Sequence, residues 1–292
     1  MGPVTTSTPD LWHHYGRTRA TLDRTVPSTF RWSWSQNTGP GPEILGDLTG
    51  RRVGDLGAGA ARHAAHLTVH HQPARVTAID ASPAQHAMAT DLYAHLAPRL
   101  RIVQADAVPH LRAKTGAYDV LYSVFGALDF TDPRTVLPAA AAALKPGGRL
   151  VFATLAHHLN GAPAQPDAVA TDIPAKSPEG EPTTMHRWVL QEHVWVKLLD
   201  EAGFTTITVD VLPAATGGPR TADTQLVSGY HPLWSGVRHG AEIPDPPTQG
   251  RRAIQPESNP RKPVEPWTPT PTGGLPRRPE PWPLGDRKQS HT

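Results

Sequence analysis

The stretch Arg51-Arg-Val-Gly-Asp-Leu-Gly-Ala-Gly-Ala60 decides the fold class of this chain. Residues 53–56 are typical of a short buried strand, Gly57-Ala58-Gly59 predicts a tight turn, and the alanine-rich residues 60–69 predict a helix. In an open α/β sheet, a strand that turns on glycines into a helix offers free N–H groups and a positive dipole end to a ligand. The stretch therefore predicts a nucleotide site at the end of a first strand.

The same stretch limits which nucleotide binds. A dinucleotide fingerprint needs a third glycine where Arg62 stands, and no phosphate-binding Walker sequence occurs in the chain. Asp55, directly before the first glycine, places a carboxylate beside the ligand, which suits a cationic amino group better than a phosphate. An NAD-linked oxidoreductase, which would also need a Tyr-x-x-x-Lys dyad, is ranked last.

Two further acids follow predicted strands downstream. Residues 75–80 predict a second strand that ends in Asp80, which can accept hydrogen bonds from both hydroxyls of a ribose. Residues 100–104 predict a third strand, and Asp106 beyond it can accept a hydrogen bond from an adenine amino group. These acids supply groups for two parts of one nucleoside.

Residues 118–123 predict a fourth strand, and Lys145-Pro-Gly-Gly148 predicts a turn into a fifth over 149–155. With these five motifs in order, about residues 45–232 resemble the class I S-adenosylmethionine-dependent methyltransferases. The resemblance implies S-adenosylmethionine as cofactor and an α/β, Rossmann-like, doubly wound seven-stranded sheet, mostly parallel with an antiparallel edge pair. The pair is expected from residues 205–212 and 224–230. The residues assigned to the cofactor are Asp55, Gly57, Ala58, Gly59, Asp80, Ala81, Asp106, Ala107 and Ser123.

Three regions are expected: a lid segment over residues 1–44 with a helix at 11–24, a methyltransferase domain over 45–232 and a proline-rich disordered tail over 233–292. The resemblance implies that the first segment covers the cofactor, with Tyr15, Trp32 and Phe125 lining the substrate pocket. Alternation of aromatic residues at 30, 32 and 34 is equally typical of a half-buried strand that packs in the core. An insertion at about 156–189 is expected to shape the acceptor pocket, and the tail is a possible docking arm for a protein partner.

Methyl transfer to a hydroxyl or an ammonium group needs a base whose pKa is near neutrality, and histidine is the natural choice. The candidates are His157, His158 and His186, because strand ends and the insertion converge there. Other histidines, such as His66 on the first helix, are expected to face solvent. No metal is expected, since adjacent histidines in a strand point to opposite faces.

The composition of the chain limits which kinds of partner and substrate are expected. The chain has no cysteine, and no apolar run approaches the length of a membrane span, so a cytoplasmic protein without a membrane partner is expected. Nine Lys and Arg against six Asp and Glu follow residue 232, which leaves the remainder slightly acidic and argues against a nucleic-acid substrate. We therefore expect methyl transfer to an O or N atom of a small molecule, such as a specialised metabolite. The alternative is a non-catalytic cofactor-binding scaffold that recruits a partner through its tail.

Overall fold

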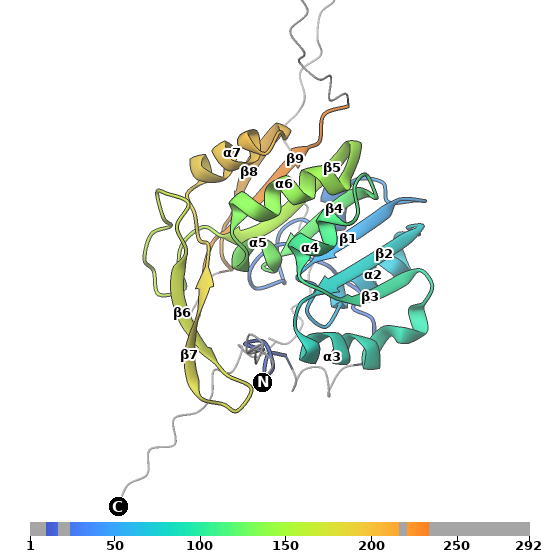
Figure 1. Ribbon diagram of the computed structural model, residues 1–292, viewed down its shortest axis with the longest axis horizontal. Coiled ribbons are helices and arrows are strands. Elements are labelled where there is room, and N and C mark those ends of the chain that lie inside the picture. The colour runs from blue at the N-terminus through green and yellow to red at the C-terminus, as the bar shows by residue number, and fades with distance from the viewer. Residues whose placement is uncertain (1–9, 17–23, 216–220, 234–292) are drawn as a thin grey trace, which may run out of the picture. The chain divides into compact units, whose positions relative to one another are not determined.

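Seven strands form one sheet, in the order β3-β2-β1-β4-β5-β9-β8, in the computed structural model, which describes residues 10–16, 24–215 and 221–233 (Figure 1). In chain order the elements are η1 (Pro42–Leu45), β1 (Arg52–Leu56), α2 (Arg62–His70), β2 (Arg75–Asp80), α3 (Pro83–Tyr93), η2 (Ala94–Leu96), β3 (Leu100–Gln104), α4 (Ala107–Arg112), β4 (Tyr118–Val124), α5 (Ala127–Phe130), α6 (Pro133–Ala143), β5 (Leu144–Leu155), β6 (Thr171–Lys176), β7 (Pro182–Arg187), α7 (Glu192–Glu201), β8 (Thr205–Leu212) and β9 (Thr224–Tyr230).

Strand direction confirms the expected fold class. β1 pairs in parallel with both β2 and β4, β3 extends the parallel set beyond β2, and β5 extends it beyond β4. β9 runs antiparallel to β5 and to β8, which makes the antiparallel edge pair. Because parallel strands end on the same side, the loops that follow β1, β2, β3 and β4 lie along one edge of the sheet.

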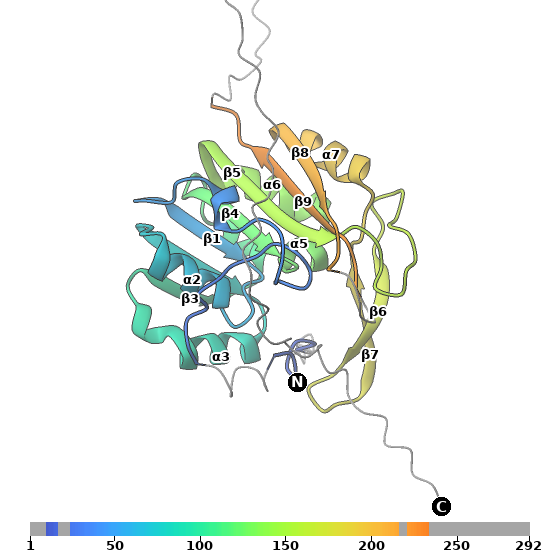
Figure 2. The ribbon, with the colours of Figure 1, turned by 180° about the vertical axis from the view of Figure 1, so that it is seen from behind.

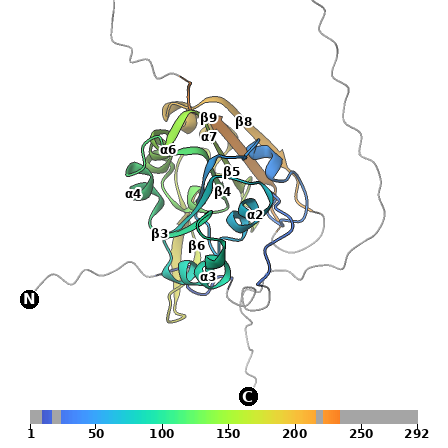
Figure 3. The ribbon, with the colours of Figure 1, turned by 90° about the vertical axis from the view of Figure 1, so that its right-hand side faces the viewer.

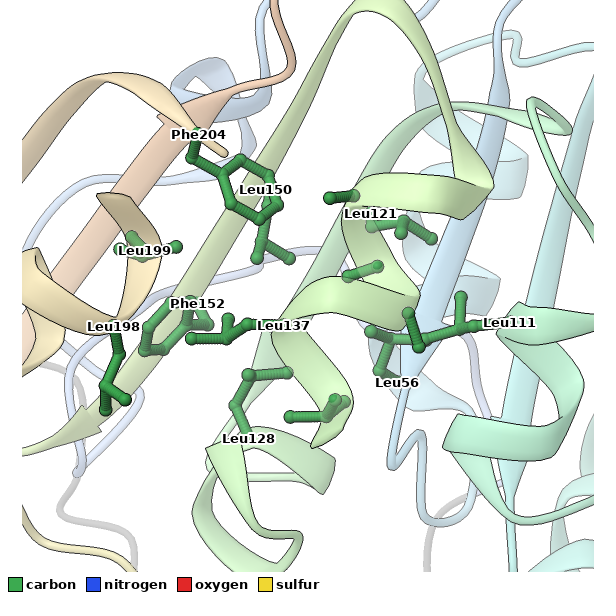
Figure 4. Close-up of a cluster of buried hydrophobic side chains, with 14 of the residues drawn as sticks. Leu56, Leu111, Leu121, Leu128, Leu137, Leu150, Phe152, Leu198, Leu199 and Phe204 are labelled. Carbon is green, nitrogen blue, oxygen red and sulfur yellow. The ribbon is translucent and has the colours of Figure 1, made fainter. Parts of the chain in front are cut away.

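Helices cover both faces of the sheet, as Figures 2 and 3 show. On one face, α4, α5, α6 and α7 pack against leucines of β1, β4 and β5 and a phenylalanine of β5 (Figure 4). On the other face, η1, α2 and α3 close a second core. Each fully buried leucine in these cores contributes roughly 1.5–3 kcal/mol of transfer free energy. The two cores hold the ligand edge of the sheet rigid.

Gly54 illustrates how the central strand is packed. A glycine lowers strand propensity, which suggests a weaker first strand. A Cβ atom at Gly54 would lie 2.6 Å from Cδ2 of Leu121 and 3.1 Å from the ring of Tyr118. Neighbouring large side chains therefore fill the space that a β-branched residue would occupy, and the position requires a glycine.

Several local expectations are corrected. Residues 11–16 form turns where a helix is expected, and residues 17–23 lie outside the described part. The insertion expected at about 156–189 contains β6, which pairs with β7 in a separate two-stranded hairpin that extends from the domain (Figure 1). His66 is buried rather than solvent-facing, because its ring packs against Phe30 and its Nδ1 contacts the carbonyl oxygen of Pro27 at 2.8 Å.

The chain divides into two units, Met1–Ser235 and Gly236–Thr292. The second unit, and with it the expectations for a disordered tail and its partner, lies outside the described residues. In the described part of the chain, no helix has the length and apolar character needed to cross a membrane.

Candidate active site

The glycine turn after β1 is packed directly against the start of α5. Gly57 has a φ of +74°, and a Cβ atom there would lie 2.2 Å from the backbone N of Ala127. The N–H groups of Gly57 and Ala58 both donate to the carbonyl oxygen of Ile79, at 2.9 and 3.0 Å. These donors are therefore already used within the protein, and the turn does not present them to a phosphate.

Asp80 joins the glycine turn to the next helix. Its Oδ2 accepts from the N–H of Gly59 at 2.7 Å, and its Oδ1 accepts from the N–H of Ser82 at 2.9 Å. Ser82 in turn caps α3 by accepting from the N–H of Gln85. Burial raises the pKa of the Asp80 carboxyl, and the two N–H donors oppose that rise. Each carboxylate oxygen can accept more than one hydrogen bond, so two ribose hydroxyls can still be bound there.

Asp55 lies beneath the turn and is almost fully buried. Tyr122 on β4 donates its hydroxyl to Oδ2 of Asp55 at 2.7 Å. Burial raises the pKa of Asp55 to about 7, the Tyr122 hydroxyl lowers it, and the charge of Asp80 adds to the rise. An acid that titrates near neutrality becomes ionised when a cationic group is bound beside it.

Asp106 follows β3 and is exposed. It caps α4, because its Oδ1 accepts from the N–H of Val108 at 2.9 Å, while Ala107 is buried as the first residue of that helix. The third acid thus stands on the same edge as the first two, with room for a ligand on its solvent side.

Two sequence expectations need correction. Trp32 is 0% exposed, packs against Phe30 and Tyr122 and donates from Nε1 to the carbonyl oxygen of Gly41, so its ring belongs to the core and not to a pocket wall. Ser123 is also fully buried, and its hydroxyl donates to the carbonyl oxygen of Leu56 at 2.7 Å. That hydroxyl fixes β4 to β1 and is not available to a cofactor.

Residues 10–16 bridge three parts of the site. Asp10 accepts from the Ser82 hydroxyl at 2.9 Å, beside Asp80. The Gln85 side-chain amide donates to the carbonyl oxygens of Trp12 and Tyr15, both at 2.9 Å. The ring of Trp12 meets that of Phe130 on α5 edge to face at 4.6 Å. Nε2 of His14 contacts the carbonyl oxygen of Ser177, between β6 and β7, at 3.1 Å. This segment therefore links the nucleotide side of the site to α5 and the hairpin.

The aromatic residues differ in position. Tyr15 is 46% exposed and its ring meets Trp12 at 5.4 Å. Phe125, at the end of β4, has a φ of +49°, an uncommon conformation for a side chain of its size, and its ring meets that of Trp34 at 4.9 Å. The rings of Phe125 and Trp34 thus lie at the end of β4, whereas Tyr15 lies beside Trp12.

The three histidines occupy different settings. Nδ1 of His157 contacts the carbonyl oxygen of His158, and its Nε2 accepts from the N–H of Asp223, so both ring nitrogens are used. His186 is exposed on the hairpin and pairs with Asp172. His158 is buried, and within the described residues its Nε2 has no hydrogen-bond partner. Burial lowers the pKa of His158, and the charge of Arg187 lowers it further.

Arg187 and Asp129 form a buried ion pair that sequence analysis missed. Nη2 of Arg187, at the end of β7, lies 2.6 Å from Oδ2 of Asp129 on α5. The residues are 58 positions apart, and no spacing rule connects them. The one available signal is the position of Asp129 just beyond β4, on the ligand edge. As for metals, the described ranges contain no group of three or more His, Asp or Glu side chains placed to hold an ion.

The topology, together with acids near the ends of β1 and β2 and just after β3, defines a Rossmann-like nucleotide-binding domain. Residues 53–148 match the family model described as a methyltransferase domain. This part of the chain is therefore similar to a methyltransferase domain, in line with the class I S-adenosylmethionine-dependent methyltransferases that the sequence motifs resemble.

Individual relatives are distant. The chain is 32% identical over 113 residues to a ubiquinone biosynthesis O-methyltransferase of Cronobacter sakazakii, a match that covers 39% of this chain and 46% of that protein. The chain thus spans about half the length of this curated relative.

Solved structures show the same fold. Phosphoethanolamine N-methyltransferase 2 of Haemonchus contortus, in complex with S-adenosyl-L-methionine, superposes with a TM-score of 0.56 at 13% identity. That comparison covers 79% of this chain and 61% of the other. The 1,6-didemethyltoxoflavin-N1-methyltransferase of Burkholderia thailandensis is 19% identical over 76% of this chain and 84% of its own, with a TM-score of 0.47. At 13% identity, the likeness to the Haemonchus contortus protein concerns the fold alone.

Proposed function

We propose that this protein is an enzyme that transfers a methyl group from S-adenosylmethionine to an O or N atom of a small molecule. The observation that carries the proposal is the line of three acids, Asp55, Asp80 and Asp106, along one edge of a methyltransferase-domain sheet. The glycine turn beside them uses its first N–H groups internally, which favours an adenosine with an amino-acid arm over a pyrophosphate.

Each of the three acids is proposed to bind a different part of the cofactor. Asp80 accepts hydrogen bonds from the ribose hydroxyls, and Asp106 accepts one from the adenine amino group. The glycine turn, Gly57-Ala58-Gly59, leaves room for the ligand to lie close to the protein backbone. Asp55 becomes ionised beside the ammonium group of the amino-acid arm, because a neighbouring cation favours the charged form of a carboxyl. Bound S-adenosylmethionine supplies a methyl group on a sulfonium, which leaves as a neutral thioether.

His158 is the base that the geometry favours. Burial and the charge of Arg187 lower the pKa of its imidazole, which favours the neutral form, and its Nε2 has no hydrogen-bond partner among the described residues, so it can take a proton from the acceptor. His157 lacks a free ring nitrogen, and His186 is exposed beside Asp172. Tyr15 and Phe125 hold the acceptor body, and residues 10–16 exclude water once they cover it.

The proposed class of acceptor and the proposed cellular location are inferred from the composition of the chain. A small-molecule acceptor of the specialised-metabolite kind, rather than a nucleic acid, agrees with the slightly acidic residues 1–232. The cytoplasm is the proposed location, in line with a chain that has no cysteine.

Calorimetric titration with S-adenosylmethionine, S-adenosylhomocysteine and NADH tests the cofactor. Micromolar binding of the two sulfur ligands and none of NADH is expected, with at least a tenfold loss in Asp80→Asn. Asp91→Asn, on the exposed side of α3 and paired with Arg24, is the matched control and should bind as the wild type does. Equal binding by both variants would contradict the assigned role of Asp80.

Transfer of a labelled methyl group to a panel of small hydroxyl and amine compounds tests the reaction. His158→Asn should lower the rate at neutral pH at least a hundredfold, whereas His186→Asn should retain it. Labelling of tRNA or rRNA alone would reject the small-molecule acceptor. Cofactor binding without turnover on any acceptor would favour a scaffold over an enzyme.

A further inference from the structure

Arg187 is a buried cation on the acceptor side of the site. Its side chain is 6% exposed at the end of β7, where the hairpin meets α5 (Figure 1). Nε and Nη2 both donate to one oxygen of Asp129, Oδ2, at 3.1 and 2.6 Å. Guanidinium–carboxylate pairs commonly match two donors to two oxygens. Here Asp129 leaves Nη1 of the guanidinium unused, and Oδ1 of Asp129 has no hydrogen-bond partner in the described part of the chain.

Aromatic rings surround this guanidinium. Its Cζ atom lies 5.4 Å from the ring centre of Trp34 and 5.2 Å from that of Phe130. Trp34 contacts Phe125, and Phe130 contacts Trp12. The guanidinium charge therefore lies beside two pairs of contacting aromatic rings. Such stacking fixes the plane of a guanidinium while its edge stays available for hydrogen bonds.

Neutral polar groups face the same region. Nε2 of His158 and Oγ1 of Thr154 are buried and lack hydrogen-bond partners among the described residues. Thr154, near the end of β5, lies close enough to Asp129 to lower the pKa of that carboxyl, although no hydrogen bond of normal length joins them. Buried polar groups are normally paired in proteins, so unpaired groups beside a cation indicate an absent ligand.

We infer that Arg187 is a specificity-determining residue that binds an oxyanion of the methyl acceptor, an inference that rests on the proposed methyl transfer. Arg187 donates from its guanidinium edge, and Thr154 and His158 complete the hydrogen bonds. The opposite reading is a clamp that only holds the hairpin to α5, to which the Trp188 N–H also contributes by donating to the carbonyl oxygen of Asp129.

The oxyanion has two possible sources. It is either a carboxylate elsewhere on the acceptor or the acceptor hydroxyl in its ionised form. In the second case the hydroxyl proton moves to Nε2 of His158, and an oxygen electron pair forms the bond to the methyl carbon. The electron pair of the broken C–S bond returns to sulfur.

The test measures probe binding to the protein saturated with S-adenosylhomocysteine. Benzoate is expected to bind the wild type at least tenfold more tightly than its neutral counterpart benzamide, and Arg187→Gln should abolish that preference. Arg149→Gln is the matched control, because Arg149 is partly buried, stacks over Tyr230 and bonds to Ile44 near the start of β5, away from this site. It should retain the preference.

A second probe separates the two sources. 4-Nitrophenol changes its absorbance on ionisation, so spectra of the bound probe report whether the site holds a phenolate. Ionisation on binding to the wild type, lost in Arg187→Gln, identifies the acceptor hydroxyl. A protonated bound probe together with a benzoate preference identifies a carboxylate. If Arg187→Gln does not fold, Arg187→Lys keeps the charge without the planar edge and should still weaken benzoate binding severalfold.

Equal binding of benzoate and benzamide to the wild type, or a preference kept in Arg187→Gln, would overturn the inference and leave a structural clamp. In both cases S-adenosylhomocysteine still binds, and the proposed methyl transfer stands. Failure of the wild type to bind S-adenosylhomocysteine would instead overturn the proposed function and this inference with it.

Discussion

Gly57 is the residue at which the ligand edge tolerates least change. Its φ is +74°, and a side chain would meet the backbone N of Ala127 at 2.2 Å. Gly57→Ala should therefore lower the free energy of unfolding by at least about 3 kcal/mol, since backbone on both sides must move. Urea denaturation measures this.

Gly116 supplies the control for that substitution. It has a φ of +59° with nothing within 4 Å of a built Cβ atom. Gly116→Ala should cost only the left-handed conformation, about 1–2 kcal/mol. Equal losses in the two variants would mean that the turn after β1 is not closely packed.

Asp55 makes stability depend on pH. Its folded pKa of about 7 lies above the ordinary value of 3.8, so between these values the folded state binds more protons than the unfolded state. The contribution of Asp55 is therefore fully present below pH 3.8 and is lost as pH rises toward and through 7. Over the whole titration this amounts to on the order of 4 kcal/mol.

Asp55→Asn tests that dependence, because an amide keeps the shape and does not titrate. The stability of this variant relative to wild type should rise between pH 5 and pH 8 in urea denaturation. Asp80 remains in the variant, and burial raises its pKa. The stability of the variant should therefore still fall as pH rises, with a smaller slope than in the wild type. Parallel profiles for the two proteins would show that Asp55 is already ionised at pH 5.

Sequence reasoning locates residues whose positions are set by local structure. The place of Asp80 at the end of β2 could be predicted, because the βαβ unit puts a strand end about twenty residues after the glycines. Trp32 and Ser123 could not, because alternation does not say whether a ring faces a pocket or a second core, and a serine does not show where its hydroxyl points. Arg187 could not be predicted, since its partner is brought to it by tertiary folding alone.

At the scale of elements, one side chain of α3 makes two of the hydrogen bonds that hold residues 10–16. Gln85 is buried, and its amide donates to the carbonyl oxygens of Trp12 and Tyr15. If this segment covers the cofactor, Gln85→Met should release it while keeping side-chain volume. Two lost hydrogen bonds of about 1 kcal/mol each predict roughly a thirtyfold faster dissociation of S-adenosylhomocysteine.

Stopped-flow displacement measures that rate. Thr90→Ala on the same helix is the control, because the Thr90 hydroxyl donates only to the His86 carbonyl oxygen within the helix. An unchanged rate in Gln85→Met would mean that residues 10–16 do not retain the cofactor.

Elements were predicted best where one periodicity is uninterrupted. The bounds of β2, β3, β8 and β9 agree with the expected ranges, since each is a short apolar or alternating run between turn residues. β6 was missed because Pro174 lies within it, and a proline argues against a strand except in an exposed ribbon such as this hairpin. The helix expected from residue 11 competes with contacts to α3 and α5, and turns form instead.

At the scale of the whole molecule, the described residues that form the two buried cores all precede Ser235. A chain ending at Ser235 should therefore keep its melting temperature within about 2 °C of the full chain and bind S-adenosylmethionine equally well. Differential scanning calorimetry and titration measure both quantities. A large loss of stability would show that residues 236–292 contribute to the domain.

The same truncation should weaken the binding of the protein to polyanions. Residues 233–292 carry nine Lys and Arg and six Asp and Glu, and their removal changes the net charge from +2 to about −1. Weak, salt-sensitive retention on heparin or DNA is expected for the full chain and should disappear in the shorter one, because non-specific binding follows the basic excess. Retention that survives truncation would place a basic surface on the methyltransferase domain itself, and a nucleic-acid acceptor would then have to be reconsidered.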